Sequence, residues 1–268
     1  MDTSPSWLTL IEATGEDRDD FLQGQLTQDL RRVDASFPVR LAASCDAKGR
    51  VLAVLTLIRH GDRLLLALRA DQAQAWLTHV LRFRLRARVD LVPCDDLKLV
   101  AEATDTDWTP LADATRKHPP TDALSWQIGG ITEHLVPATA AENTLDTSTW
   151  RAARIAAGIA DVGPAATGDF TPHMLGLDLV GAVSFSKGCY TGQEVVARTE
   201  HLGAVKRRAQ RVRVSEGALE EGTALQSGER TAGRIVAASG DTALAVLPVA
   251  DDGGPLTLDD GRAVERVA

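Results

Sequence analysis

Aromatic residues and cysteines are scarce in this chain. Phenylalanine, tryptophan and tyrosine make up 4% of its 268 residues, and Tyr190 is the only tyrosine. So few rings offer little surface on which unpaired RNA bases could stack. The three cysteines, Cys45, Cys94 and Cys189, are odd in number and widely spaced. This spacing fits neither a disulfide framework nor a grouped metal or iron–sulfur site, so we expect a reduced, cytoplasmic protein without a metal site.

Long apolar runs are absent as well. No run approaches ~18 residues, so no membrane span is expected. The start, Met-Asp-Thr-Ser-Pro, lacks the basic and apolar regions of a signal peptide. The net charge of −8 argues against extensive coating of nucleic acid but leaves room for a local basic patch. The chain is 44% hydrophobic and 25% charged, which is typical of a globular protein with one large or a few small domains.

The most informative segment is the octapeptide Lys-Gly-Cys-Tyr-Thr-Gly-Gln-Glu at residues 187–194. It lies between a strand-like run at 182–185 and a helix-like run at 193–202. Thr191 and Glu194 have the spacing of a capping box, in which the hydroxyl and the carboxylate bind backbone N–H groups at the helix start. Gly203 predicts the end of that helix. The octapeptide therefore predicts a turn that places reactive side chains at a helix N-terminus.

Cys189 and Lys187 are the candidate catalytic residues of this octapeptide. A helix N-terminus carries partial positive charge, and with Lys187 two residues away it favours the thiolate form of Cys189. The alternative is a small, buried hydrophobic cysteine beside a helix cap that has no further role. The remaining motif residues are candidates for shaping the site, because glycine allows positive φ or close approach to a ligand: Gly188, Tyr190, Thr191, Gly192, Gln193 and Glu194.

The pattern of apolar residues predicts mixed α and β structure followed by a β-rich end. After residue 205, short β-like pieces alternate with Gly, Ser and Asp clusters and show no helix signal, as in a small antiparallel barrel or sheet. The expected strands are 7–13, 38–45, 51–58, 64–68, 81–89, 97–103, 210–214, 232–237 and 242–247. The expected helices are 17–33, 71–81 and 149–157, and 113–122 is an expected loop.

Two basic clusters are candidate anion sites. The alternation at 81–89 would place Arg82, Arg84, Arg86 and Arg88 on one strand face. That face is either solvated and neutralised by acidic neighbours or a platform for phosphates or polyglutamate. The second cluster directly follows the motif helix and could bind a carboxylate or an RNA phosphate. It consists of Lys206, Arg207, Arg208, Arg211 and Arg213.

Several segments together resemble one known family. The octapeptide looks like the signature of the YgfZ family of folate-binding proteins, which are relatives of the glycine-cleavage T-protein, an aminomethyltransferase. The resemblance spans nearly the whole chain and rests on the octapeptide and on residues 21–29, 154–158, 168–172 and 203–208. It implies an α+β, T-protein-like fold of mixed or antiparallel sheets with helices around a central channel, plus a small C-terminal β-barrel. The expected units are 1–112, 113–204 with the motif, and 205–268.

The resemblance also implies a function. It suggests an accessory protein that binds tetrahydrofolate and supports iron–sulfur cluster assembly or repair, and through it iron–sulfur-dependent tRNA modification. The implied partners are iron–sulfur client or assembly proteins and, as an open alternative, tRNA itself. Folate contacts are expected from Arg151, Arg154, Arg207 and Arg208, with Cys189 beside the folate channel.

Two departures from the transferase pattern bear on the chemistry. Gly49 is followed by residues 50–54, Arg-Val-Leu-Ala-Val, where aminomethyltransferases carry an acidic pair. The transferase pattern Arg-x-Glu-Ala-Gly here has Ala156 in place of the glutamate. Without a general acid–base group, ordinary aminomethyl transfer is disfavoured. A folate-dependent aminomethyl or one-carbon transferase and a tRNA- or protein-binding module remain the alternatives.

Overall fold

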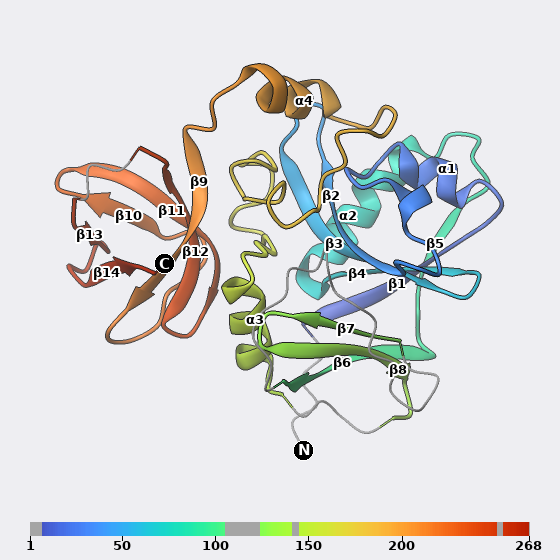
Figure 1. Ribbon diagram of the computed structural model, residues 1–268, viewed down its shortest axis with the longest axis horizontal. Helices are drawn as coiled ribbons and strands as arrows, with labels where there is room; N and C mark the ends of the chain where they lie inside the picture. The colour runs from blue at the N-terminus through green and yellow to red at the C-terminus, as the bar shows by residue number, and fades with distance from the viewer. Residues whose placement is uncertain (1–6, 105–123, 141–144, 251–253, 268) are drawn as a thin grey trace.

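The computed structural model describes residues 7–104, 124–140, 145–250 and 254–267. Three β structures surround a long irregular segment (Figure 1). A five-stranded sheet and a three-stranded sheet form one side of the molecule, and a closed barrel forms the other. No helix in the described ranges is long and apolar enough to cross a membrane.

The five-stranded sheet is antiparallel, with the order β2-β3-β4-β1-β5. Strand β4 is buried on both faces: Leu64 and Leu66 pack with Trp76 of α2, whereas Leu65 faces a second core shared with the rest of the molecule. This two-sided burial explains the continuous apolar runs in its sequence. The elements are β1 (Leu8–Thr14), α1 (Arg18–Gln23), η1 (Leu30–Arg32), β2 (Val39–Cys45), β3 (Val51–His60), β4 (Arg63–Arg69), α2 (Ala70–Val80), η2 (Leu81–Phe83) and β5 (Asp90–Pro93).

The three-stranded sheet packs against a helix through a buried ionic cluster. Its strands β6 (Leu97–Ala103), β8 (Ile131–Pro137) and β7 (Leu124–Ile128) lie in that order, beside α3 (Thr147–Ala156). Glu133 of β8 is fully buried and accepts hydrogen bonds from the indoles of Trp126 and Trp150 at 2.8 and 2.6 Å. Arg154 of α3 donates to Glu133 and, through two nitrogens, to Asp161. These contacts join β7, β8, α3 and the segment after it.

The C-terminal barrel closes in the order β10-β11-β12-β9-β14-β13. Val212, Leu225 and Ile235 are among the residues that fill its interior. Helix α4 (Gln193–Leu202) carries the chain from the motif to the barrel (Figure 1). The barrel strands are β9 (Arg207–Val214), β10 (Ala224–Ser227), β11 (Arg230–Ser239), β12 (Thr242–Pro248), β13 (Leu256–Thr257) and β14 (Ala263–Arg266).

Most predicted strands are confirmed, as are the helices at 71–81, 149–157 and 193–202 and the C-terminal barrel. Strand β6 precedes residue 112 and pairs with β8, which follows it, so the three-stranded sheet includes strands from both sides of the predicted boundary. The start of β9 lies close to the predicted boundary at 205. The division into units at 112 and 204 stays a prediction. The loop predicted at 113–122 lies outside the described residues.

Three predicted elements were wrong. The helix at 17–33 is interrupted after Gly24, because the N–H of Thr27 binds the carbonyl of Ala43 in β2 instead of continuing the helix. Residues 182–185 contain no strand; the N–H of Ser184 binds the Thr27 carbonyl. The alternating segment 81–89 is a short 3₁₀-helix followed by turns, with Leu85 at φ +44° and 90% exposed. In these cases local periodicity was overruled by tertiary contacts.

Two of the four arginines of segment 81–89 are paired with acidic side chains. Arg84 pairs with Asp90, and Arg88 pairs with Glu16 and Asp17. Arg82 contacts His79 instead. Because the segment is not a strand, the four side chains do not form the single basic face that the alternation predicts.

We expect the Arg154→Met substitution to lower the free energy of unfolding by about 3–5 kcal/mol, because it leaves the carboxylates of Glu133 and Asp161 buried without their cation. Urea unfolding followed by circular dichroism measures this. Arg84→Met is the matched control, since both partners of the Arg84–Asp90 pair are exposed, and its effect should stay within about 0.5 kcal/mol. Equal effects of the two substitutions would contradict the structural role assigned to Arg154.

Candidate functional site

The motif loop is anchored by Lys187. Its ammonium donates hydrogen bonds to the carbonyls of Gln23, Leu26 and Gln28 at 2.6, 2.6 and 2.9 Å, and the residue is 7% exposed. Burial lowers the pKa of Lys187 to about 8. The three donors of the ammonium match the three carbonyls, as a buried charge requires. Lys187 therefore pins the motif to the segment after α1 rather than facing solvent as a reagent.

Two neighbouring side chains strengthen this attachment. Thr27 is fully buried; its hydroxyl donates to the Ala182 carbonyl at 2.7 Å and accepts from the N–H of Ala43 at 2.8 Å. The amide of Gln28 donates to the Gly181 carbonyl at 2.7 Å. Local spacing gave no sign that these residues bind the motif loop. The only signal available was that both segments carry the family resemblance.

The helix after the motif starts differently from the capping-box prediction, which was wrong. Its N-cap is Gly192 at φ +83°, and no side chain caps the helix. A Cβ at Gly192 would lie 2.4 Å from the Asp46 carbonyl oxygen, so glycine is needed for the close approach to the β2–β3 hairpin. The Thr191 N–H instead binds the Gly24 carbonyl at 3.1 Å, and Glu194 is exposed.

Cys189 is exposed at the tip of the motif loop, flanked by exposed Gly188 and buried Tyr190. The Lys187 ammonium lies 5.1 Å from the centre of the Tyr190 ring, a cation–π contact that adds to the anchor. Burial raises the pKa of the Tyr190 hydroxyl, which holds it in its neutral form. The interpretation of Cys189 as a buried hydrophobic residue is therefore wrong. The fold presents Cys189 to solvent on a loop that Lys187 anchors.

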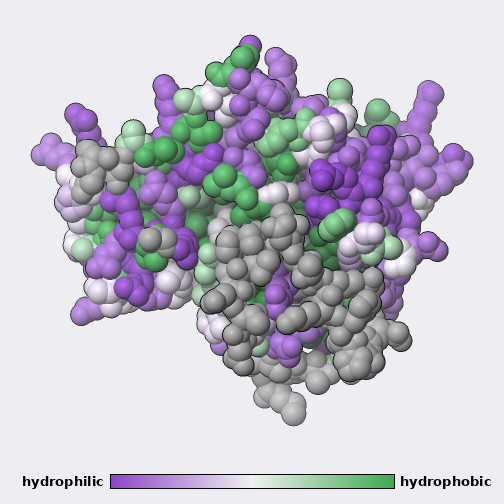
Figure 2. All heavy atoms as spheres, in the orientation of Figure 1, coloured by the Kyte–Doolittle hydropathy of each residue, from purple (hydrophilic) through white to green (hydrophobic). Residues whose placement is uncertain are grey.

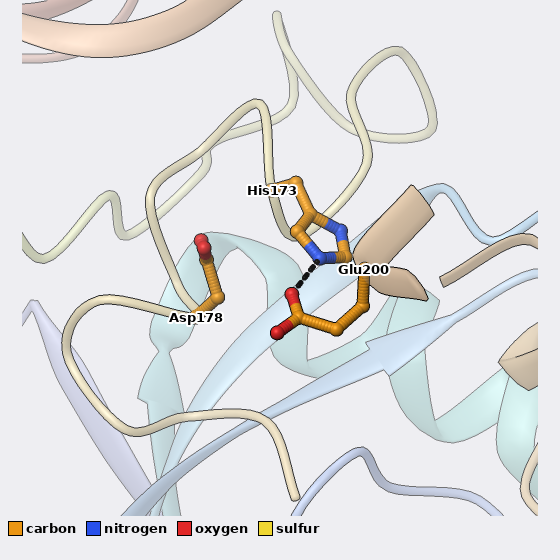
Figure 3. A group of neighbouring side chains, drawn as sticks. All are labelled: His173, Asp178 and Glu200. Atoms are coloured by element: carbon orange, nitrogen blue, oxygen red, sulfur yellow. Dashed lines mark hydrogen bonds and ion pairs between the residues drawn. The ribbon is translucent and has the colours of Figure 1, made fainter. Parts of the chain in front are cut away.

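A second polar group lies beside the motif helix (Figure 3). His173 is 1% exposed, and its Nε2 lies 3.1 Å from the carboxylate of Glu200 in α4. Asp178 lies near them, but both of its oxygens accept hydrogen bonds from the Arg208 guanidinium, at 2.7 and 3.1 Å. Because the Arg208 guanidinium already occupies Asp178, this group is better explained as a polar link between α4, the segment 173–178 and β9 than as a metal site.

An apolar cavity of about 600 Å³ lies where the three β structures meet. On the face drawn in Figure 2, hydrophobic residues gather between the barrel and the five-stranded sheet. Arg211 is the only charged side chain among the described lining residues, and none of them is a carboxylate. The described lining consists of Leu41, Ile128, Gly129, Gly130, Ala156, Ala157, Gly158, Ile159, Leu175, Gly176, Leu179, Val180, Ala209, Arg211 and Leu244.

The cavity and the motif cysteine are separate in the described structure. Cys189 is not among the described residues of the cavity lining, and its placement beside a folate channel stays a prediction. Ala156, which stands where the transferase pattern has glutamate, does line the cavity. The missing carboxylate at that position therefore bears directly on cavity chemistry.

The four arginines predicted to contact folate have internal partners. Arg151 pairs with Glu221 at 2.6 Å, and Arg154 belongs to the buried cluster with Glu133 and Asp161. Arg207 donates to the carbonyls of Ala232 and Val246. Arg208 pairs with Asp178. None of the four is in the described cavity lining, whereas Arg211 from the same basic cluster is.

We expect Lys187→Met to lower the free energy of unfolding at pH 7 by about 2–4 kcal/mol, because it strips three buried carbonyls of their donor. Lys48→Met on the exposed hairpin is the control, with an expected effect within about 0.5 kcal/mol.

The pKa of Lys187 is lowered from 10.5 to about 8, so between these pH values the unfolded chain binds more protons than the folded chain. The stability contribution of Lys187 should then rise across that pH window and be missing from the variant. Urea unfolding of both variants, repeated from pH 7 to 10.5, checks both statements.

The three thiols should react with an alkylating reagent at different rates. Cys189 is exposed, Cys94 half-buried and Cys45 1% exposed; burial raises the pKa of the Cys45 and Cys94 thiols. Iodoacetamide should modify Cys189 at least about tenfold faster than Cys45, which should react only after unfolding. Peptide mass spectrometry measures the order, with Cys189→Ser as control. Labelling of Cys45 at the same rate in the folded protein would contradict the structure.

The chain is similar in sequence and in fold to known proteins. Residues 206–267 match the family described as CAF17, C-terminal beta-barrel domain. The chain is 32% and 31% identical, over 226 residues each, to the tRNA-modifying protein YgfZ of Escherichia fergusonii and of Escherichia coli; each match covers 76% of this chain and 69% of the relative. The fold is similar to that of the glycine cleavage system aminomethyltransferase T from Bartonella henselae, with a TM-score of 0.70, 17% identity and coverage of 98% of this chain and 83% of that one. The T-protein likeness concerns the fold, and the sequence identity shows that the chain belongs to the YgfZ family.

Proposed function

We propose that this chain supports tRNA modification as a folate-binding accessory factor for iron–sulfur proteins. The observation that carries the proposal is its identity of 32% to a relative named tRNA-modifying protein YgfZ, across 76% of this chain. The T-protein-like fold supports the folate part, and the exposed Cys189 on its rigid loop supports the thiol part. A cytoplasmic location belongs to the same proposal.

The cavity fits a ligand of the size of tetrahydrofolate. Its volume of about 600 Å³ lies within the range of roughly 300–1,000 Å³ typical of small-molecule sites. Gly130 and Gly176 line it, and a Cβ at either position would meet no atom within 4 Å. Apolar walls with open space beside them suit a flat ring system. When bound, a tetrahydrofolate would supply one-carbon or redox chemistry.

The described lining argues against aminomethyl transfer. Such a reaction needs a group that manages the proton of the reacting amine. The described cavity wall offers no carboxylate, histidine or cysteine. In the hairpin strand after Gly49, Arg50 donates to the Asp169 carbonyl, and the following four residues are apolar. We therefore favour folate binding without ordinary transferase activity.

Cys189 is proposed to act on an iron–sulfur client rather than on the folate. Thiolates are the usual protein ligands of iron–sulfur clusters, and an exposed one is accessible to a partner protein. Cys189 is exposed and is not among the described residues of the cavity lining, so we propose that client and folate bind at once. The cluster would belong to the client, since the three cysteines of this chain are far apart in sequence.

Direct tRNA binding finds less support. Arg84, Arg88, Arg208 and Arg213 are paired with acidic groups, and Arg207 donates to backbone carbonyls. Five of the nine basic residues of the two clusters are thus held by internal contacts, and paired arginines gain little from releasing counterions of RNA phosphates. A role through protein partners is therefore the better-supported interpretation.

Complementation tests the proposal. In an Escherichia coli strain without its own YgfZ, the unaltered chain should restore modified nucleosides of tRNA, measured by mass spectrometry. Cys189→Ser should restore no more than the empty vector, whereas Cys94→Ser should rescue, because a serine hydroxyl can replace the thiol that contacts Asp96. Cellular levels and thermal unfolding of each variant show whether it folds. Full rescue by Cys189→Ser would refute a thiol role, and no rescue by the unaltered chain would refute the role in tRNA modification.

A further inference from the structure

We propose that Arg211 binds the carboxylate end of the ligand in the cavity, and that the rest of the ligand is held by apolar and backbone contacts alone. This inference rests on the proposed function, because it concerns the same cavity. It assigns the ligand to a chemical class: an elongated molecule with a flat apolar body and a terminal carboxylate. In a folate, the carboxylate end is the glutamate tail.

The position of Arg211 follows from the alternation along β9. Val212 and Val214 point into the barrel core, so Ala209, Arg211 and Arg213 lie on its outer face. Ala209 packs against the core shared with the two sheets, whereas the Arg213 side chain is 54% exposed. Arg211 lies between these two and is half-buried. Its side chain therefore lines the cavity while keeping contact with solvent, so that a charged ligand end bound to it stays hydrated.

The Arg211 guanidinium is free to bind a ligand. In the part of the chain that the structure describes, its side chain has no hydrogen-bond or ion-pair partner. The neighbouring Arg207, Arg208 and Arg213 of the same strand all have one. Arginine presents a planar set of donors that matches a carboxylate through two parallel hydrogen bonds. A free arginine beside an apolar cavity therefore points to an anionic ligand group.

The other described residues of the cavity wall have no side chain that could hydrogen-bond to the polar edge of a pterin ring. Apart from Arg211, every described lining residue is glycine, alanine, leucine, isoleucine or valine. The 2-amino group and N3–H of a pterin are donors, and a carboxylate is the side chain best suited to accept from both. At Ala156, which faces the cavity, no carboxylate is present. Binding energy should therefore depend on the tail and only weakly on the oxidation state of the ring.

Isothermal titration calorimetry with four probes tests this division. Tetrahydrofolate and folic acid should bind the unaltered protein with dissociation constants within about threefold of each other, since a difference of one hydrogen bond would give more. The tail fragment p-aminobenzoylglutamate should still bind, and 6-methylpterin, which has no carboxylate, should not. Binding of 6-methylpterin as tight as that of tetrahydrofolate would overturn the inference.

Two arginine variants on the same strand face isolate the contact. Arg211→Ala should weaken tetrahydrofolate binding by about 10- to 100-fold, the loss expected for a charged hydrogen-bonded pair. Arg213→Ala, outside the described cavity lining, should leave it unchanged. Arg211→Lys should restore part of the affinity, because it keeps the charge without the paired donors. Thermal unfolding confirms that each variant folds.

The outcomes distinguish a failure of this inference about Arg211 from a failure of the proposed folate binding. If the unaltered protein binds none of the folates, the folate part of the proposed function fails and the inference fails with it. If tetrahydrofolate binds but Arg211→Ala has no effect, only the inference fails. Loss of affinity in Arg211→Ala but not in Arg213→Ala supports both.

Discussion

The contact between the Lys187 ammonium and three backbone carbonyls holds the functional part of this molecule together. Its acceptors belong to the segment after α1, about 160 residues earlier in the chain, at separations of 164, 161 and 159 residues. A buried ammonium is tolerated only with full hydrogen bonding, so the two segments cannot separate without exposing or stranding a charge. Thr27 and Gln28 add neutral hydrogen bonds between the segment after α1 and the residues that precede the motif. The exposed position of Cys189 is a consequence of this anchor.

Cys189 is not among the described lining residues of the cavity, yet side-chain contacts connect the helix that follows it to the cavity wall. Glu200 of the motif helix contacts His173 (Figure 3). Asp178 of the same irregular segment pairs with Arg208 of β9. Leu175, Gly176 and Leu179 of that segment line the cavity, as does Ala209 next to Arg208. The wall of the cavity is thus bonded on one side to the helix that follows Cys189.

Sequence patterns predicted the elements whose formation depends on local properties. Strands β2, β3 and β4 are confirmed because continuous apolar runs interrupted by glycine turns have few other ways to be buried. The prediction failed at Thr191 and Glu194, where capping-box spacing is present but Gly192 makes the N-cap against the Asp46 carbonyl. At Arg208, local patterns contained no sign of the Asp178 carboxylate that binds it, because that carboxylate comes from a distant loop.

By itself, the sequence determined the family, the mixed α and β architecture, the barrel after residue 205, and the absence of a carboxylate at position 156. These depend on residue identity and on periodicity over short spans, which the chain carries in linear order. Only the tertiary structure decided that Lys187 is an anchor, that Cys189 is exposed, and that Arg211 faces the cavity while Arg207 and Arg208 do not. A polar side chain binds whichever partners the packed fold brings within about 3 Å, and those partners lie far apart along the chain. The octapeptide therefore identifies the family, and the packing around it assigns the role of each residue.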